Sequence, residues 1–264
     1  MDLQLRHTRA LISGSTAGIG LAVAKALARE GADVIVNGRS EGRVEAAVKE
    51  IHQAGASGGV FASAADLSSR NGVDSLLRQF PAVDILVNNL GMYEPKPFEQ
   101  ITDEDWLRIF EFNVLSGVRL SRAYLPGMKK KNWGRIIFIS SESGINIPAE
   151  MIHYGVTKTA QLAVSRGLAE TTAGTGVTVN SVLPGPTRSE GVEQFVQSMA
   201  RERKTDAATI EKEFFQTVRP SSLLQRFATT DEVAALVAFV ASPLSSATNG
   251  AALRVDGGVV RSAF

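Results

Sequence analysis

Short apolar runs alternate with amphipathic helical segments along this chain, and that alternation most constrains its fold. The first run, residues 10–13, ends in a glycine, and Ile19, Val23 and Leu27 then recur at helical spacing. Later runs, such as 135–140, are almost continuously apolar, which is typical of strands covered on both faces. The sequence therefore predicts parallel strands in a sheet that lies between two layers of helices.

The complete pattern predicts about seven strands in a single α/β domain. The predicted strands cover residues 10–13, 34–36, 60–64, 84–88, 135–140, 177–183 and 252–255. The predicted helices include 42–53, 73–80, a long helix from Thr102 to about Lys130, 152–172 and a last one that opens with a capping box at Thr229. Because no linker or repeat interrupts the pattern, we expect one Rossmann-type doubly wound domain over 1–264, with helices on both faces.

One segment departs from this alternation of strands and helices. From Pro184 to Thr229 the chain runs about 45 residues without a convincing strand, and its helix-like parts are 193–203 and 209–218. An excursion this long in a compact domain is typical of a functional lid. We expect a substrate lid at about 186–227; a simple surface insertion is the alternative.

Charge and cysteine content exclude several classes of function. Lys and Arg number 28 against 27 Asp and Glu, so no basic excess favours nucleic acid. The absence of cysteine excludes disulfides and thiolate metal sites, and the few histidines have no ligand-spaced partners, so no metal site is expected. The start of the chain has no targeting pattern and no apolar stretch approaches the ~20 residues of a membrane span. We expect a soluble, cytoplasmic protein that acts on small molecules.

A glycine-rich turn follows the first predicted strand. Residues 13–20 contain Gly14, Gly18 and Gly20 where the chain must turn sharply into a helix. Glycine lets the backbone approach a pyrophosphate, and the N-terminus of a helix offers unpaired N–H groups to an anion. The turn indicates a dinucleotide site, with a plain tight turn as the alternative.

The end of the second strand favours NADP(H), while NAD(H) remains possible. An acidic residue that would bind the ribose 2′-hydroxyl is absent at Gly38, and Arg39, which follows, suits a 2′-phosphate. In the alternative interpretation Arg39 is a solvated loop residue and Glu41 meets the ribose. We expect Glu41 instead to begin the next helix.

Tyr154 and Lys158 form a candidate acid–base pair. They stand four residues apart in a predicted helix and thus share one face. A nearby cation favours the phenolate form of a tyrosine, which makes it a proton donor and acceptor closer to neutral pH.

Four motifs together resemble the short-chain dehydrogenase/reductase family, including its bacterial 3-oxoacyl-(acyl-carrier-protein) reductases. They are the glycine-rich turn at 13–20, Asn-Asn-Leu-Gly at 88–91, Ser-Ser at 140–141 and Tyr-x-x-x-Lys at 154–158. Matches also occur at Asp66, Asn113, 184–185 and 256–258. Ser13 and Leu90 depart from the usual threonine and alanine, both at scaffold positions.

This resemblance implies roles for individual residues. Tyr154 would exchange a proton with the substrate oxygen during hydride transfer, interconverting a carbonyl and a secondary alcohol. Ser141 would hold that oxygen, Lys158 would bind the nicotinamide ribose and lower the tyrosine pKa, and Asn113 would anchor a proton-supplying water chain. The residues expected at the cofactor are Gly14, Ser15, Thr16, Gly18, Ile19, Gly20, Arg39, Ser40, Asp66, Leu67, Asn89, Gly91, Tyr154, Lys158, Pro184, Gly185 and Thr187.

Two other functions remain open. One is reduction of a 3-oxoacyl group on acyl carrier protein, although Asn132 and Thr175 stand where such reductases often carry docking arginines. The other, from a different class, is a non-catalytic NADP-binding regulator, against which the complete catalytic set argues. The resemblance also implies a homo-oligomer, dimer or tetramer, that pairs the long helices.

Overall fold

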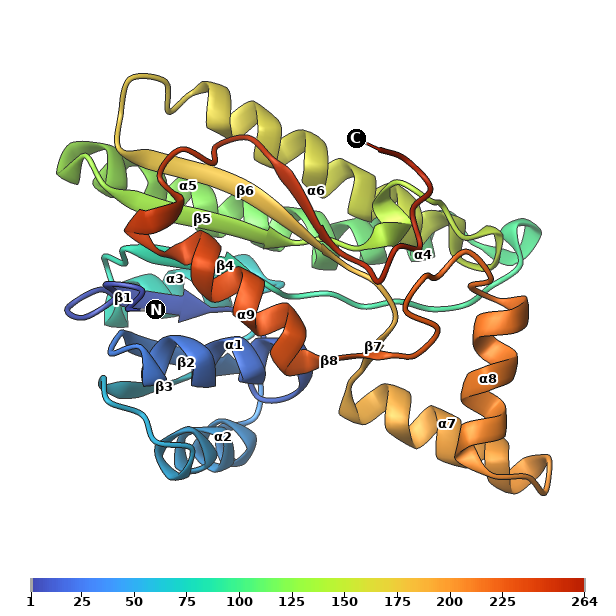
Figure 1. Cartoon of the computed structure of the whole chain (residues 1–264). Coiled ribbons are helices and arrows are strands. Elements are labelled where there is room, and N and C mark those ends of the chain that lie inside the picture. The colour runs from blue at the N-terminus through green and yellow to red at the C-terminus, as the bar shows by residue number, and fades with distance from the viewer. Residues whose placement is uncertain (1, 264) are drawn as a thin grey trace.

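The computed structural model describes residues 2–263 and confirms the doubly wound α/β fold (Figure 1). Its main sheet contains seven parallel strands in the order β3-β2-β1-β4-β5-β6-β9. These strands are β1 (Arg9–Ile12), β2 (Asp33–Gly38), β3 (Val60–Ala64), β4 (Ile85–Asn88), β5 (Gly134–Ile139), β6 (Val177–Pro184) and β9 (Ala252–Val255). The order reverses between β1 and β4, which are neighbours in the sheet although β2 and β3 lie between them in the sequence.

Helices cover both faces of the sheet, as expected. They are α1 (Gly18–Arg29), α2 (Glu41–Gln53), α3 (Arg70–Gln79), α4 (Asp103–Phe110), α5 (Ser116–Lys131), α6 (Ile152–Glu170), α7 (Glu190–Glu202), α8 (Ala207–Thr217) and α9 (Thr230–Ala241). The capping boxes of α4 at Thr102 and α9 at Thr229 are both formed, which fixes where these helices begin.

Successive side chains of β1 and of β5 enter different cores. In β1, Ala10 and Ile12 pack in a cluster with α1, α2 and α9, whereas Leu11 packs in a second cluster with α3, α5 and α6. In β5, Ile137 joins the first cluster and Phe138 the second. This two-sided burial is the physical reason why the strands read as continuous apolar runs.

The predicted helix from Thr102 to Lys130 differs from the structure in one respect. A π-helical segment, Glu111–Leu115, lies between α4 and α5. Hydrophobic periodicity does not reveal it, because a single wider turn shifts the apolar face by only one residue. Such turns frequently occur at functional sites, and this one carries Asn113.

The segment 186–227 forms a helical lobe beside the carboxyl edge of the sheet, made of α7 and α8 (Figure 1). The two helices share a small apolar cluster that includes Val196, Ile210 and Phe215. A pair of two-residue parallel strands, β7 (Thr187–Arg188) and β8 (Ala228–Thr229), joins the two ends of the lobe. These strands escaped sequence prediction because two residues carry no periodicity.

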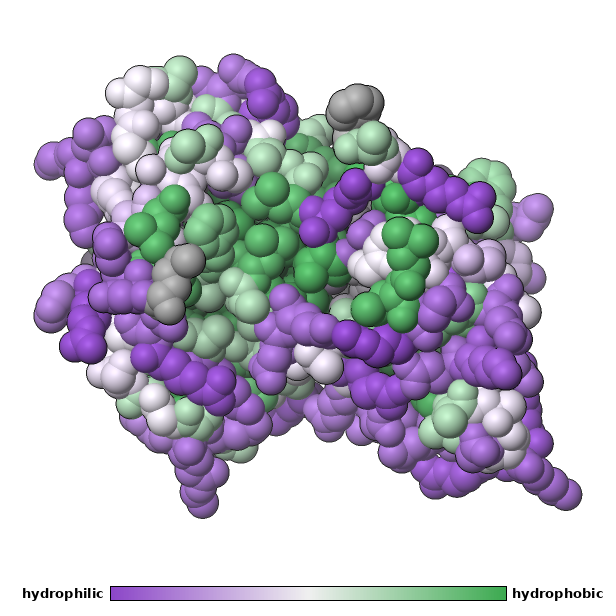
Figure 2. Space-filling view, in the orientation of Figure 1, coloured by the Kyte–Doolittle hydropathy of each residue, from purple (hydrophilic) through white to green (hydrophobic). Residues whose placement is uncertain are grey.

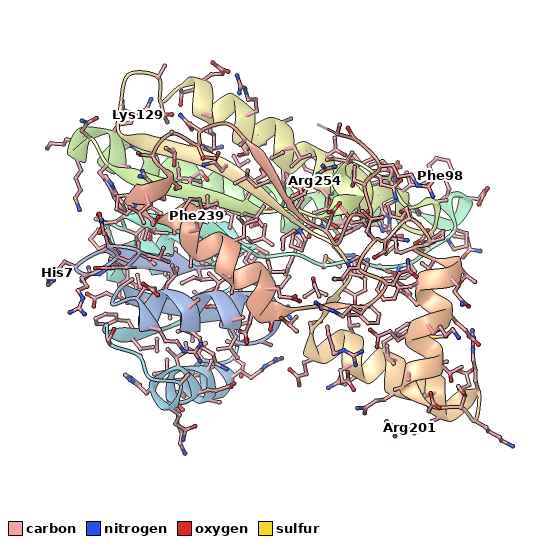
Figure 3. All side chains as sticks on the ribbon, in the orientation of Figure 1. His7, Phe98, Lys129, Arg201, Phe239 and Arg254 are labelled. Atoms are coloured by element: carbon pink, nitrogen blue, oxygen red, sulfur yellow. The ribbon has the colours of Figure 1, made fainter. Side chains whose placement is uncertain are left out.

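The exposed surface differs between the lobe and the sheet domain. Figure 2 shows mostly hydrophilic side chains over the lobe, whereas apolar side chains gather at the centre of the same face, over α9 and β9. Figure 3 places Phe239 on α9 in that central area and Arg201 at the far end of α7. Among residues 2–263, none of the helices has the length and apolar character needed to cross a membrane.

Candidate active site

A cavity of about 420 Å³ lies at the carboxyl ends of β1, β2 and β4, next to the point where the strand order reverses. Open α/β sheets bind ligands at this position. Most residues that line the cavity are among those expected at the cofactor. The lining consists of Gly14, Thr16, Asn37, Gly38, Arg39, Ser40, Arg43, Ala65, Asp66, Leu67, Asn89, Leu90, Gly91 and Phe112.

Two asparagines hold the glycine-rich turn in place. Asn37, at the end of β2, accepts a hydrogen bond from the Gly14 N–H, and Asn89 donates from Nδ2 to the carbonyl of Gly14. Gly14 and Gly18 have φ angles of 63° and 56°, which glycine adopts without strain. A Cβ on Gly20 would lie 2.5 Å from Asn89 Nδ2, so only glycine fits there.

The turn leaves the N-terminus of α1 available to an anion. The residue before the helix, Ala17, provides no side-chain cap for the first N–H groups. Ile19 lies in the first turn of the helix. Ser15 is fully buried, and its hydroxyl donates to the Ile12 carbonyl and accepts from the Asn37 N–H, so its side chain stabilises the turn itself. The backbone of this region therefore fits a pyrophosphate.

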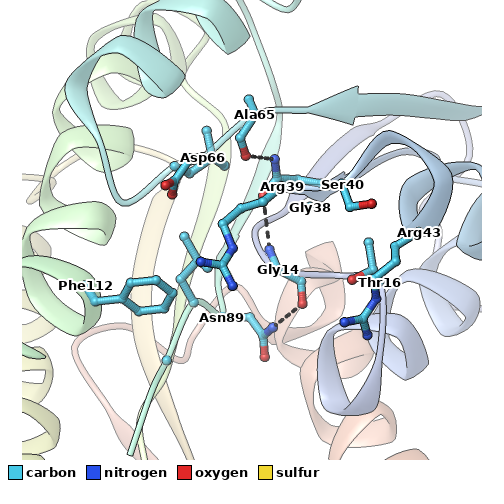
Figure 4. A pocket seen from close by; sticks show the side chains of 14 residues that line it. Gly14, Thr16, Gly38, Arg39, Ser40, Arg43, Ala65, Asp66, Asn89 and Phe112 are labelled. Carbon is cyan, nitrogen blue, oxygen red and sulfur yellow. Dashed lines mark hydrogen bonds between the residues drawn. The ribbon is translucent and has the colours of Figure 1, made fainter.

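Two arginines extend over the other end of the cavity. Arg39 and Arg43 are both exposed, and the guanidinium group of neither forms a hydrogen bond or ion pair within residues 2–263 (Figure 4). Sequence reasoning missed Arg43, although its position four residues after Arg39, in the first turn of α2, was a signal. Glu41 is the first residue of α2, as expected. Two unpaired guanidinium groups beside Ser40 and Thr16 fit a phosphate.

A second cavity, of about 570 Å³, lies between the sheet edge and the helical lobe. Ser141 and Tyr154 line it, together with Gly185 and Thr187 from the end of β6 and β7. The lobe contributes an apolar wall of Val192, Phe195, Val196, Met199, Ile210, Phe214 and Phe227. Tyr93, Met151, Phe195 and Met199 also line this cavity.

The predicted catalytic residues come together beside this cavity. Lys158 Nζ lies 5.6 Å from the centroid of the Tyr154 ring, as their shared helix face predicts. A Cβ added to Gly91 would lie 3.4 Å from Lys158 Nζ. The lysine therefore lies close to the wall of the first cavity, which Gly91 lines. Ser141 and Tyr154 line the same cavity, and the Ser141 hydroxyl is close enough to lower the pKa of the Tyr154 phenol.

Burial dominates the pKa values of this pair. It raises the pKa of Tyr154 to about 12, which the hydrogen bond with Ser141 opposes and the carboxylate of Glu142 reinforces. It also lowers the pKa of Lys158 to about 7. The expected lowering of the tyrosine pKa is therefore absent in the protein alone, because desolvation has the largest effect on this phenol.

Asn113 is buried in the π-helical segment with its side chain fully bonded. Its Nδ2 donates to the carbonyl of Met92 and to Thr157 Oγ1, both at 2.9 Å, and its Oδ1 accepts from the Met92 N–H. Thr157 in turn donates to the carbonyl of Tyr154. Asn113 therefore joins the loop after β4 to the helix that carries Tyr154.

The end of β6 is closely packed at Pro184 and Gly185. A Cβ on Gly185 would lie 2.5 Å from the carbonyl oxygen of Asp256, so glycine is required there. Thr187 Oγ1 donates to the Gly185 carbonyl and fixes the following turn. This packing brings the backbone at 184–187 to the edge of the second cavity.

A buried ion pair lines the second cavity and was missed from the sequence. Arg219 Nε donates to Glu142 Oε1 at 2.9 Å, and Arg219 Nη1 lies 3.3 Å from Glu150 Oε1. Both Arg219 and Glu142 are almost fully buried. The pair ties the residues after α8 to the residue that follows Ser141. No signal marked it, because the partners are 77 residues apart in sequence.

Comparison with known proteins decides the family. The family model for short chain dehydrogenases matches residues 8–204. The chain belongs to the short-chain dehydrogenase/reductase family. Within residues 2–263, this family member has no group of three or more His, Asp or Glu side chains that could hold a metal ion.

Relatives of this family member match along their whole length. An uncharacterized oxidoreductase, YvaG of Bacillus subtilis, is 48% identical over 264 residues and covers 100% of both chains. A D-beta-hydroxybutyrate dehydrogenase of Cupriavidus necator is 37% identical, covering 97% of this chain and 99% of its own. The crystal structure of L-sorbose reductase from Gluconobacter frateurii, in complex with NADPH and L-sorbose, has a TM-score of 0.93 at 28% identity and covers 99% of this chain and 100% of its own. The protein is thus a nicotinamide-dependent oxidoreductase of alcohol and carbonyl groups.

The buried lysine makes stability depend on pH. Lys158 has a folded-state pKa of about 7 against an ordinary value of 10.5, so the unfolded chain binds more protons between these pH values. Its contribution to stability therefore rises as pH increases from about 7 towards 10.5. We expect Lys158→Met to stabilise the protein most near pH 7, with the gain shrinking towards pH 10, measured by denaturant unfolding.

The exposed Lys130 provides the control for this experiment. Lys130→Met should not reproduce the gain in the free energy of unfolding that Lys158→Met gives near pH 7, because the Lys130 side chain is exposed. Parallel stability curves for the wild type and Lys158→Met would contradict the lowered pKa of Lys158.

Proposed function

We propose that the protein interconverts a carbonyl and a secondary alcohol with NADP(H), and that Tyr154 is the general acid and base. The observation that carries the proposal is the position of Tyr154 and Ser141 in the wall of the larger cavity, with Lys158 beside the wall of the smaller one. The first cavity then holds the dinucleotide and the second holds the substrate. Each predicted catalytic residue has a role in this arrangement.

The proton chemistry follows from the environment of the tyrosine. With a pKa of about 12, the Tyr154 phenol keeps its proton at neutral pH and is able to donate it to a carbonyl oxygen. Ser141 holds the same oxygen by a hydrogen bond. The cofactor, when bound, supplies or accepts the hydride. Lys158, once charged and near the phenol, favours the phenolate that alcohol oxidation requires.

The segment 186–227 acts as the substrate lid in this proposal. Its helices supply the apolar wall of the second cavity, including Phe195, Phe214 and Phe227. An apolar wall excludes water from the reacting carbon and strengthens the hydrogen bonds to the substrate oxygen. This supports a free small-molecule substrate that the lobe covers.

The preference for NADP(H) rests on the two unpaired arginines. We expect NADPH to raise the melting temperature at a much lower concentration than NADH, because a ligand stabilises only when its concentration exceeds its dissociation constant. Arg39→Ala and Arg43→Ala should each weaken stabilisation by NADPH about tenfold or more, in line with the loss of a charged hydrogen bond of ~1.5–3 kcal/mol. They should leave stabilisation by NADH nearly unchanged.

Arg78, exposed on α3, supplies the matched control. Arg78→Ala should leave the response to both cofactors unchanged. If NADH stabilises at the lower concentration, the phosphate-binding role of the two arginines is wrong.

The role of Tyr154 is tested by removing its hydroxyl. Tyr154→Phe should reduce turnover by at least about 100-fold, the lower range for a positioned acid, with cofactor affinity nearly intact. Turnover is measured as NADPH oxidation with a simple ketone, L-sorbose, acetoacetate and a 3-oxoacyl carrier-protein thioester. The control is Tyr124→Phe, because Tyr124 is buried away from the site and donates to the Phe80 carbonyl.

Each result distinguishes the functions left open by the sequence. Substantial turnover by Tyr154→Phe would overturn the acid–base role. A rate with the carrier-protein thioester far above the rates with the free carbonyl compounds would favour the 3-oxoacyl reductase. Cofactor binding without turnover of any carbonyl or alcohol would favour a regulatory protein.

We also propose that the protein is a homo-oligomer that pairs α5 and α6. These helices border a shallow cavity with apolar lining, which includes Leu125, Pro126 and Leu168. A mass in solution of two or four chains is expected from light scattering. A monomeric mass at micromolar concentration would contradict the pairing.

A further inference from the structure

Gln161 occupies an unusual place behind the catalytic residues. It lies on α6, three residues after Lys158, and is 1% exposed. Its Oε1 accepts a hydrogen bond from Lys158 Nζ at 3.3 Å, and its Nε2 donates to the main-chain carbonyl of Asn113 at 2.6 Å. Burial of a side-chain amide is unfavourable unless both ends are bonded, and here both are.

The first of these bonds acts on the ammonium group of Lys158. Lys158 Nζ donates to two neutral oxygens, the Ile139 carbonyl at 2.9 Å and Gln161 Oε1. Within residues 2–263 it forms no ion pair with a carboxylate, so its hydrogen-bond acceptors are what favour the charged form. Loss of Gln161 Oε1 would leave a single acceptor and a lysine free to turn away from Tyr154.

The second bond occupies the carbonyl of Asn113. The sequence led us to expect a water chain anchored at Asn113, but the Gln161 amide already spans from this carbonyl to Lys158 Nζ. A side-chain amide holds geometry and does not pass protons as water does. At this point a covalently attached side chain bridges the Asn113 carbonyl and Lys158 Nζ.

We propose that Gln161 is a positioning residue of the reaction, which holds the Lys158 ammonium towards Tyr154 by bridging it to the Asn113 carbonyl in the place of a water molecule. This inference rests on the proposed function, since it needs Tyr154 and Lys158 to act in turnover. Gln161 itself lines neither of the two cavities.

Two substitutions separate positioning from packing. Gln161→Met keeps the volume of the side chain but leaves Lys158 Nζ and the Asn113 carbonyl without their bridge. Gln161→Ala removes the bridge but opens a polar space with two hydrogen-bonding partners, which suits a water molecule. If Gln161 only filled space, Gln161→Met would be the better tolerated substitution, because substitutions that conserve volume cost the least stability.

We expect Gln161→Ala to be the more active of the two variants and Gln161→Met to be the more stable. We expect kcat to fall about tenfold or more in Gln161→Met, within the contribution of positioned proton transfer. In Gln161→Ala we expect kcat within about threefold of the wild type, because a bridging water restores nearly equivalent hydrogen bonds. The melting temperature should be lower for the alanine variant than for the methionine variant.

The control is Ser165→Ala, one helical turn further along the same buried face. The Ser165 hydroxyl has no hydrogen-bond partner within residues 2–263, so kcat should remain at the wild-type value. If kcat of the Gln161 variants follows their melting temperatures, with Met at least as active as Ala, Gln161 is a packing residue and the inference is wrong.

The outcome also separates this inference from the proposed function. Tyr154→Phe is assayed beside the Gln161 variants with the same carbonyl compound and NADPH. An inactive Tyr154→Phe together with a fully active Gln161→Met overturns only the role of Gln161. An active Tyr154→Phe overturns the acid–base role and, with it, the positioning role.

Discussion

Parallel strands place all their carboxyl ends at one edge of the sheet, and every functional feature of this protein depends on that edge. Both faces of the sheet are buried under helices, so the edge is where backbone and polar side chains meet an open space. The glycine-rich turn follows β1, Asn37 ends β2, Asn89 follows β4 and Ser141 follows β5. The strand order reverses between β1 and β4, and the first cavity opens at this point of the edge.

A second constraint is the low polarity around Tyr154 and Lys158. In the protein alone, burial raises the pKa of Tyr154 and lowers the pKa of Lys158, so it favours the uncharged form of both groups. Hydrogen-bonding partners then decide how the groups are held, and for Lys158 these are the Ile139 carbonyl and Gln161. The π-helical turn at Asn113 brings one end of the Gln161 bridge into reach.

The predictable part of the site consists of residues that follow strands. A strand such as β5 is visible as an apolar run, and the polar residues after it must lie at the carboxyl edge, which offers Ser140 and Ser141. The family resemblance then selects Ser141. Tyr154 and Lys158 were paired because helix geometry is local. Arg43 was missed because its relevance depends on the direction in which α2 leaves β2. Gln161 resembles an ordinary helix residue until its long-range contact with Asn113 is known.

The sequence by itself determined the parallel doubly wound fold and the family motifs, because strand burial, helix capping and glycine turns are encoded within short windows. Only the tertiary structure decided which side chains share a cavity and which are bonded. The Glu142–Arg219 pair and the Gln161 bridge join segments 77 and 48 residues apart. Local propensities carry no information at such separations, since the contacts arise from how α6, the π-helical turn and the lobe pack against the same edge.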